Sequence, residues 1–152
     1  MANSYINIAL HLVFAVKNRQ DKISKENLET VHKYIAGSLS NRGHYVIEIG
    51  GTANHIHILF KYNPKELLSD LIRDIKSSSS AFIAKNGYSL GTFNWQRGYG
   101  CFSADSGNLE KLRAYIRNQE QHHGEFSIKE ELRRLLRRSG MEYKEEYLFD
   151  DV

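Results

Sequence analysis

Cysteine is nearly absent from the sequence: among 152 residues, only Cys101 carries a thiol. A single cysteine excludes an internal disulfide and any zinc site built from several cysteines. No stretch approaches the ~20 apolar residues that a membrane-spanning helix needs, so we expect no membrane partner. The first residues, Met1 to Ser4, lack the basic-then-apolar layout of a secretory signal, which predicts a cytoplasmic protein.

A large excess of charge of either sign is also lacking. Lys and Arg number 21 against 18 Asp and Glu, and the resulting net charge of +3 indicates nothing by itself about nucleic acid. The pI of 8.9 is compatible with a polyanionic partner and mildly favours one. Apolar residues at 41% and charged residues at 26% are ordinary for a globular protein. We expect a single domain over residues 1–152, long enough to bury a core.

Hydrophobic periodicity predicts strands and helices in the order β-α-β-β-α-β, followed by further helices. The strands are expected at residues 4–16, at 44–49 with an end at Gly50-Gly51, at 54–62 and at 98–104. The helices are expected from Ser24 to about Gly43, from Asn63-Pro64 to about Asn86-Gly87, from 108 to 123 and from 127 to 138. This order is typical of an α+β, ferredoxin-like fold, an antiparallel sheet with both core helices on one face. The other face is left for a ligand or for the C-terminal helices. The core would span about 4–104 and the additional C-terminal helices about 106–140.

In the first strand, alternation separates an apolar face from a polar one. The apolar face holds Ile6, Ile8, Leu10, Leu12 and Phe14. Tyr5 and His11 fall on the other face, where we expect them to stack on nucleic-acid bases.

His55 and His57 stand two residues apart on the third predicted strand. Side chains at this spacing share a sheet face, with Cα atoms about 6.6 Å apart, and their imidazoles can converge on one cation. Ile56 and Ile58 would face the helices, so the histidines are expected on the open face, within reach of a substrate. The alternative interpretation is the polar side of an amphipathic strand, and this pair alone does not exclude it.

The predicted helix after the fourth strand carries a second stripe beside its apolar one. Tyr115 and Gln119 are one turn apart, so their side chains are neighbours. A tyrosine hydroxyl next to an amide oxygen that can bind a metal is an arrangement suited to a nucleophile. The alternative is an interface aromatic beside a solvated glutamine.

Three segments carry a family resemblance in this order: N-H-I-H-I-L-F, W-Q-R-G-Y-G-C-F-S and Y-I-R-N-Q-E-Q-H-H. Together they resemble the single-tyrosine transposases of insertion sequences, within the HUH (His-hydrophobic-His) nuclease superfamily, and the likeness covers nearly the whole chain. The resemblance implies that His55 and His57 bind a metal, that Gln119 is its third ligand and that Tyr115 is the nucleophile. No role is implied for His122 and His123.

The resemblance also implies a reaction and its partners. Tyr115 would form a 5′-phosphotyrosine with single-stranded DNA, assisted by Mg²⁺ or Mn²⁺, and a 3′-hydroxyl would later rejoin the strand. Hairpin ends would be the DNA partner. The family acts as dimers in which the tyrosine helix of one subunit can complete the partner's site, and Gly107 would then be a hinge. The alternatives are a HUH nickase acting on replication origins or host repeats, and a non-catalytic single-strand-binding module.

Basic residues near these motifs are candidates for DNA contacts. They are Lys17, Arg19, Arg73, Lys76 and Arg97. A denser arginine cluster follows on the last helix, at Arg133, Arg134, Arg137 and Arg138, which is either a DNA contact or a solvated helix face. We expect Trp95 to pack in the core, although it could stack on bases, and Cys101 to be a small buried residue.

Overall fold

The computed structural model describes residues 3–18, 21–119 and 127–152, whose strands form one antiparallel sheet in the order β2-β3-β1-β4. The strands are β1 (Ala9–Ala15), β2 (Tyr45–Thr52), β3 (His55–Lys61) and β4 (Gly100–Ser103). The helices are α1 (Leu28–Asn41), α2 (Leu68–Asn86), α3 (Leu109–Arg117) and α5 (Ile128–Arg138), with short 3-10 turns η2 (Lys25–Asn27), η3 (Ser106–Asn108) and η4 (Glu145–Tyr147). This arrangement confirms the predicted α+β, ferredoxin-like fold with additional C-terminal helices.

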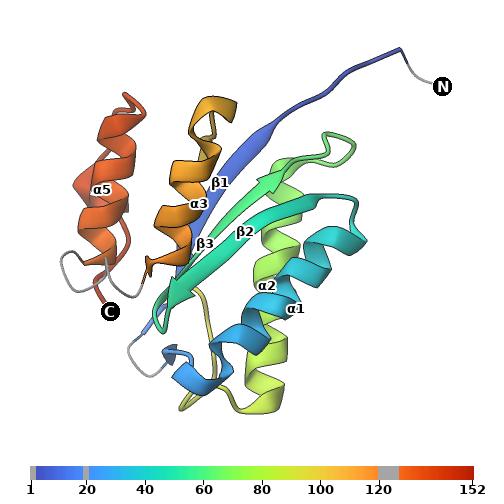
Figure 1. The fold of residues 1–152 in the computed structure, drawn as a ribbon. Coiled ribbons are helices and arrows are strands. Elements are labelled where there is room, and N and C mark those ends of the chain that lie inside the picture. Colours follow the sequence, from blue (N-terminus) through green and yellow to red (C-terminus); the bar gives the residue numbers. More distant parts are fainter. Residues whose placement is uncertain (1–2, 19–20, 120–126) are drawn as a thin grey trace.

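The sheet is covered on both faces (Figure 1). Leu12 and Phe14 of β1 and Ile58 of β3 point toward α1 and α2 and belong to the larger core cluster. On the other face, Val13 of β1 packs against Leu132 of α5. Alternation therefore assigned the faces of the sheet correctly. The second face, which the sequence left for a ligand or for the C-terminal helices, is covered by α3 and α5. No helix among the described residues is both long and apolar enough to cross a membrane.

The predicted strand ends differ from the observed ones at three places. The first strand begins at Ala9, and Tyr5 before it is fully exposed. The fourth begins at Gly100, since Gly98 has a φ of 83° and makes a turn. The prediction that Gly50-Gly51 ends a strand was wrong, because β2 continues to Thr52.

Gly50 instead allows a helix to approach the sheet. A Cβ atom added at Gly50 would lie 2.3 Å from the carbonyl oxygen of Ile116, so the backbone of α3 rests directly on β2 at this point. Gly50 is paired across the sheet with His57. The close approach thus brings the tyrosine-bearing helix next to the histidine strand.

The second core helix begins at Leu68 and not at the predicted Asn63-Pro64. Glu66 follows Asn63 at the spacing of a helix-capping pair, but its carboxylate instead accepts hydrogen bonds from Arg42 and from the His44 ring. The amide of Asn63 donates to the other nitrogen of His44. These contacts hold residues 63–67 as a loop against the end of α1, so the helix starts one turn later.

A run of four serines, Ser77 to Ser80, lies within α2 and does not interrupt the helix. Ser79 is buried, donates its hydroxyl hydrogen to the carbonyl of Ile75 and accepts a hydrogen bond from the indole of Trp95 at 2.9 Å. Trp95 is therefore a core residue, as predicted, with its ring edge-on to Phe14. Cys101 is only partly buried.

Candidate active site

The paired histidines come from the middle sheet strand β3. Both side chains point to the face covered by α3 and α5, as the period-two pattern predicts, but His55 is only 1% exposed and His57 is fully buried. The expectation that a substrate could reach them on an open face was therefore wrong. A substrate can reach the imidazoles only by passing α3 and α5.

The α3 segment brings Tyr115 and Gln119 to these histidines. Ile116 is fully buried and anchors α3 above β2, which leaves Tyr115 facing β3. The side-chain oxygen of Gln119 lies 2.9 Å from Nε2 of His55. The ring of Tyr115 stands edge-on to that of His57, with centroids 5.8 Å apart. All four residues that the sequence singled out thus meet within a single chain.

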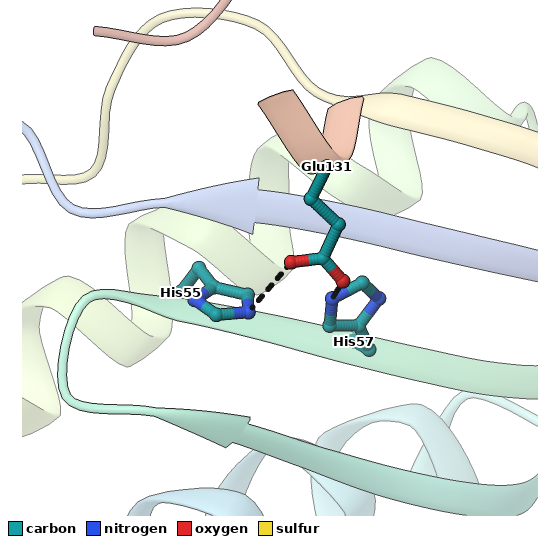
Figure 2. Close-up of side chains that lie close together, drawn as sticks. All are labelled: His55, His57 and Glu131. Carbon is teal, nitrogen blue, oxygen red and sulfur yellow. Dashed lines mark ion pairs between the residues drawn. The ribbon is translucent and has the colours of Figure 1, made fainter. Parts of the chain in front are cut away.

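A fifth residue, Glu131, completes the cluster and was missed from the sequence. It comes from α5, and its carboxylate points down between the two histidines (Figure 2). Oε1 lies 2.9 Å from Nε2 of His57, and Oε2 lies 3.4 Å from Nε2 of His55. The hydroxyl of Tyr115 donates a hydrogen bond to the same carboxylate. The available signal was an acidic residue placed between Ile128 and Leu132 on the apolar side of an amphipathic helix.

Burial and neighbouring charge have opposite effects on the pKa of Glu131, but both raise the pKa of Tyr115. Burial alone would raise the pKa of Glu131, but the nearby rings of His57 and His55 and the hydroxyl of Tyr115 lower it to about 2. Burial and then the Glu131 charge raise the pKa of Tyr115 well above its ordinary value. At neutral pH the cluster therefore combines an ionised carboxylate with a protonated phenol.

The outer nitrogens of both histidines have polar partners. Nδ1 of His57 lies 2.7 Å from Nε2 of His11, and Nδ1 of His55 lies 2.8 Å from Oδ1 of Asn54 and 3.0 Å from the hydroxyl of Thr52. Burial, with a further contribution from His57, lowers the pKa of His11 to about 3, so His11 is neutral at pH 7. His11 is only 3% exposed, so the expectation that it stacks on bases was wrong. It orients His57 instead.

This donor set fits a divalent cation. One ligand atom from each of His55, His57 and Glu131 can be chosen so that all lie within 4.8 Å of one another. Nε2 of His57 is buried and, within the described part of the chain, makes no well-directed hydrogen bond although the carboxylate is 2.9 Å away. A ring nitrogen that faces an anionic oxygen without a directed hydrogen bond is suited to sharing a cation with it. The outer partners hold each ring with Nε2 inward, as metal-binding histidines require.

A pocket of about 520 Å³ opens beside this cluster, and we call it the Tyr115 pocket. Its lining includes Tyr115 and His11 from the cluster and two cationic side chains, Lys111 of α3 and Arg138 of α5. Arg138 also works against the rise in the pKa of Tyr115, which places a positive charge near the phenol. The pocket offers an anion a way to the tyrosine hydroxyl.

Comparison with known families matches residues 4–119 to the model described as "Transposase IS200 like". The chain belongs to the IS200-like transposase family. The matched segment contains both histidines, Tyr115 and Gln119, but it ends before Glu131. The family assigns the chain to DNA transposition and recombination. No curated protein matches the sequence.

Two solved structures share the fold of this transposase. A protein of Deinococcus radiodurans R1 assigned as a transposase aligns with a TM-score of 0.60 at 16% identity, over 78% of this chain and 95% of its own. A REP-associated tyrosine transposase bound to a REP hairpin aligns with a TM-score of 0.60 at 15% identity, over 99% of this chain and 91% of its own. At these identities the likeness establishes the fold alone.

The DNA-contact candidates of this transposase fall in different surroundings. Lys17, Lys76 and Arg97 line one pocket. Arg73 lies on the outer side of α2 and pairs with Asp70 and Asp74. Arg19 lies outside the described residues, as do His122 and His123.

The arginine cluster of α5 does not act as one surface. Arg133 pairs with Glu130 and Glu145, and Arg134 lies 3.7 Å from Glu130, so these two charges are partly balanced within the protein. Arg138, at the end of the helix, lines the Tyr115 pocket. Arg133 and Arg134 therefore fit the interpretation as a solvated helix face, whereas Arg138 lines the candidate site.

Proposed function

We propose that this transposase cuts and rejoins single-stranded DNA, with Tyr115 as the nucleophile. The observation that carries the proposal is the carboxylate of Glu131, which contacts the Nε2 atoms of both histidines and the hydroxyl of Tyr115. Phenol and imidazoles therefore converge on one small volume. An arrangement that joins a nucleophile to a cation-binding cluster suits phosphodiester cleavage.

In this proposal His55, His57, Gln119 and Glu131 would hold a divalent cation. Such an ion would supply positive charge to the scissile phosphate. The mixture of imidazole nitrogens with amide and carboxylate oxygens favours Mg²⁺ or Mn²⁺ over a thiolate-seeking metal. His11, Asn54 and Thr52 keep the two rings in the required orientation through their outer nitrogens.

Tyr115 supplies the attacking oxygen. Its hydrogen bond to Glu131 orients the hydroxyl, and its raised pKa means that the proton leaves during the attack and not before it. The new bond joins Oη to phosphorus while the bond from phosphorus to the 3′-oxygen breaks, which leaves a 5′-phosphotyrosine and a free 3′-hydroxyl. The covalent bond stores the energy of the broken one, so a 3′-hydroxyl can reverse the step and join strands without ATP.

The substrate is proposed to enter through the Tyr115 pocket, where Lys111 and Arg138 face the incoming phosphate. One structure with the same fold carries a bound REP hairpin, which supports a hairpin end as the DNA partner. The described chain joins Tyr115 to its own histidines, so this arrangement needs no second subunit to complete it. A homodimer and a cytoplasmic location stay predictions from the sequence.

A covalent adduct tests the proposed function. The protein is incubated with single-stranded hairpin DNA and Mn²⁺ and resolved on a denaturing gel, where wild type should form a shifted band that Tyr115→Phe lacks. Tyr147→Phe is the matched control, because Tyr147 is 77% exposed and does not line the Tyr115 pocket. Clear binding of the hairpins without an adduct would instead indicate a non-catalytic binding module. Joined products in the same reaction separate a strand transferase from a nickase.

A further inference from the structure

A second pocket lies at the opposite end of β1 from the Tyr115 pocket. It encloses about 570 Å³ between Lys17, the serine-rich part of α2 and the segment 94–97, and we call it the Lys17 pocket. Its walls carry cationic side chains from Lys17, Lys76 and Arg97 and hydroxyls from Ser77 and Ser80. No carboxylate is present among the described residues that line it. The composition of the walls is that of an anion site.

The three cations of the Lys17 pocket lack counter-charges. Most arginines elsewhere in the described structure contact a carboxylate, as Arg42, Arg73, Arg113, Arg117, Arg133 and Arg134 do. Within residues 3–18, 21–119 and 127–152, by contrast, Lys17, Lys76 and Arg97 form no ion pair at all. Like charges that converge without a partner repel one another, and a bound anion turns this repulsion into attraction.

The pocket is held in shape before any ligand arrives. The ammonium of Lys76 donates to the carbonyls of Gln96 at 2.7 Å and Gly98 at 2.8 Å, which fixes the loop that carries Arg97. Trp95 ties the same loop to α2 through its bond to Ser79. Burial lowers the pKa of Lys76, because carbonyls alone do not replace the water that the ammonium has lost. A phosphate oxygen nearby would offset that loss.

The serine run gains a role from this geometry. Ser79 faces the core, whereas Ser77 and Ser80 stand on the pocket side of the same helix. A backbone can approach short side chains closely, and their hydroxyls can donate to phosphate oxygens. Ser79 therefore packs in the core, while Ser77 and Ser80 form a polar wall of the Lys17 pocket.

The distance between the two pockets identifies the part of the DNA involved. His11 lines the Tyr115 pocket and Lys17 lines the second one, and six residues of extended chain span roughly 20 Å. We propose that the Lys17 pocket binds a backbone phosphate of single-stranded DNA, several nucleotides away from the phosphate that Tyr115 attacks. This inference rests on the proposed function for its ligand. A pocket of about 570 Å³ has room for one phosphate and its sugar.

Binding of DNA with graded flanks tests the inference. Fluorescence anisotropy is measured in the Tyr115→Phe background, which silences covalent chemistry, with hairpins whose 5′ and 3′ single-stranded flanks are lengthened separately. Adding Lys17→Ala and Arg97→Ala should weaken binding of the long-flank hairpin by about tenfold or more, and leave the flankless hairpin unaffected. The slope of log K against log salt should fall by about 0.7, the value for one lost phosphate contact on a single strand.

The control pair is Lys33→Ala with Lys85→Ala, which removes the same charge from α1 and α2 outside the pocket. It should leave the flank dependence intact, and unchanged melting temperatures should show that both pairs fold. Equal binding by the pocket variant and its parent at every flank length overturns the inference, as does a loss that follows stem length. If wild type forms the tyrosine adduct and the pocket variant still binds normally, only this inference fails. A flank-dependent loss without any adduct upholds the pocket and rejects the proposed chemistry.

Discussion

The hydroxyl of Tyr115 on α3 donates a hydrogen bond to the carboxylate of Glu131 on α5, 16 residues further along the chain. The same carboxylate reaches His55 and His57 on β3. One side chain thus joins both C-terminal helices to the histidine strand. The position of Tyr115 above the imidazoles depends on the docking of α5 as well as on α3 itself.

Replacement of Glu131 by Gln should weaken Mn²⁺ binding. The variant keeps the shape of the side chain but removes the charge that faces two Nε2 atoms. Mutation of a residue that supports a metal site typically lowers the metal affinity by about 10–100-fold. Isothermal titration calorimetry with Mn²⁺ alone measures the effect without relying on DNA cleavage. Adduct formation at limiting Mn²⁺ should fall in parallel.

Glu130→Gln is the matched control for this substitution. Glu130 is the preceding residue on α5, but its carboxylate pairs with Arg133 and Arg134 and does not belong to the cluster. It should bind Mn²⁺ as wild type does. If Glu131→Gln binds Mn²⁺ normally while Gln119→Ala does not, the cation is held by the histidines and the amide alone.

Gly50→Ala should displace the tyrosine helix. The added methyl would lie 2.3 Å from the carbonyl oxygen of Ile116, a backbone atom that cannot move without shifting α3. Overpacking of this kind costs about 1–3 kcal/mol. Thermal unfolding measures that loss, and adduct formation by Tyr115 should fall more than global stability does, because the clash lies beneath the helix that carries the nucleophile.

Gly37→Ala is the opposite case within the same chain. Gly37 lies inside α1, and a Cβ there would have no atom within 4 Å, so the substitution should stabilise the helix by about 0.5–1 kcal/mol. Adduct formation should be unchanged. Equal effects of the two substitutions would show that the close approach of α3 at Gly50 is not a constraint on the fold.

The sequence predicted the parts of this molecule that depend on short-range periodicity. Alternation along residues 9–15 and 55–61 placed the histidines and the core side chains on the correct faces. The i, i+4 spacing of Tyr115 and Gln119 likewise made them neighbours. These patterns are local properties of a strand or a helix, and they need no knowledge of the packing partner.

What the sequence did not predict depends on contacts between distant segments. Glu131 joins the site only because α5 docks over β3, and no spacing along the chain encodes that contact. Gly50 resembled a turn residue, but the backbone of α3 requires its small size. Glu66 has the sequence position of a helix cap, but its carboxylate accepts hydrogen bonds from Arg42, just after α1, and from His44, just before β2.

Glu66 should also give the protein a measurable dependence on pH. Hydrogen bonds from Arg42 and then His44 lower the pKa of Glu66 from its ordinary 4.5 to about 2. A carboxylate whose pKa is lower in the folded state stabilises the protein above its unfolded pKa, and this contribution disappears as pH falls toward the folded value. Glu66→Gln should therefore lower the free energy of unfolding by about 1–2 kcal/mol at pH 7, after allowance for the partial exposure of the pair. At pH 2 the free energy of unfolding should be almost unchanged.

Urea unfolding of wild type and Glu66→Gln at steps between pH 7 and pH 2 measures this difference. The two stability curves should converge between about pH 5 and pH 2, because protonation of Glu66 in wild type removes the same ion pairs that the variant lacks. Glu26→Gln is the control, since Glu26 is exposed and forms no ion pair among the described residues. A gap between wild type and Glu66→Gln that stays constant down to pH 2 would mean that Glu66 stabilises the loop through its shape and not through its charge.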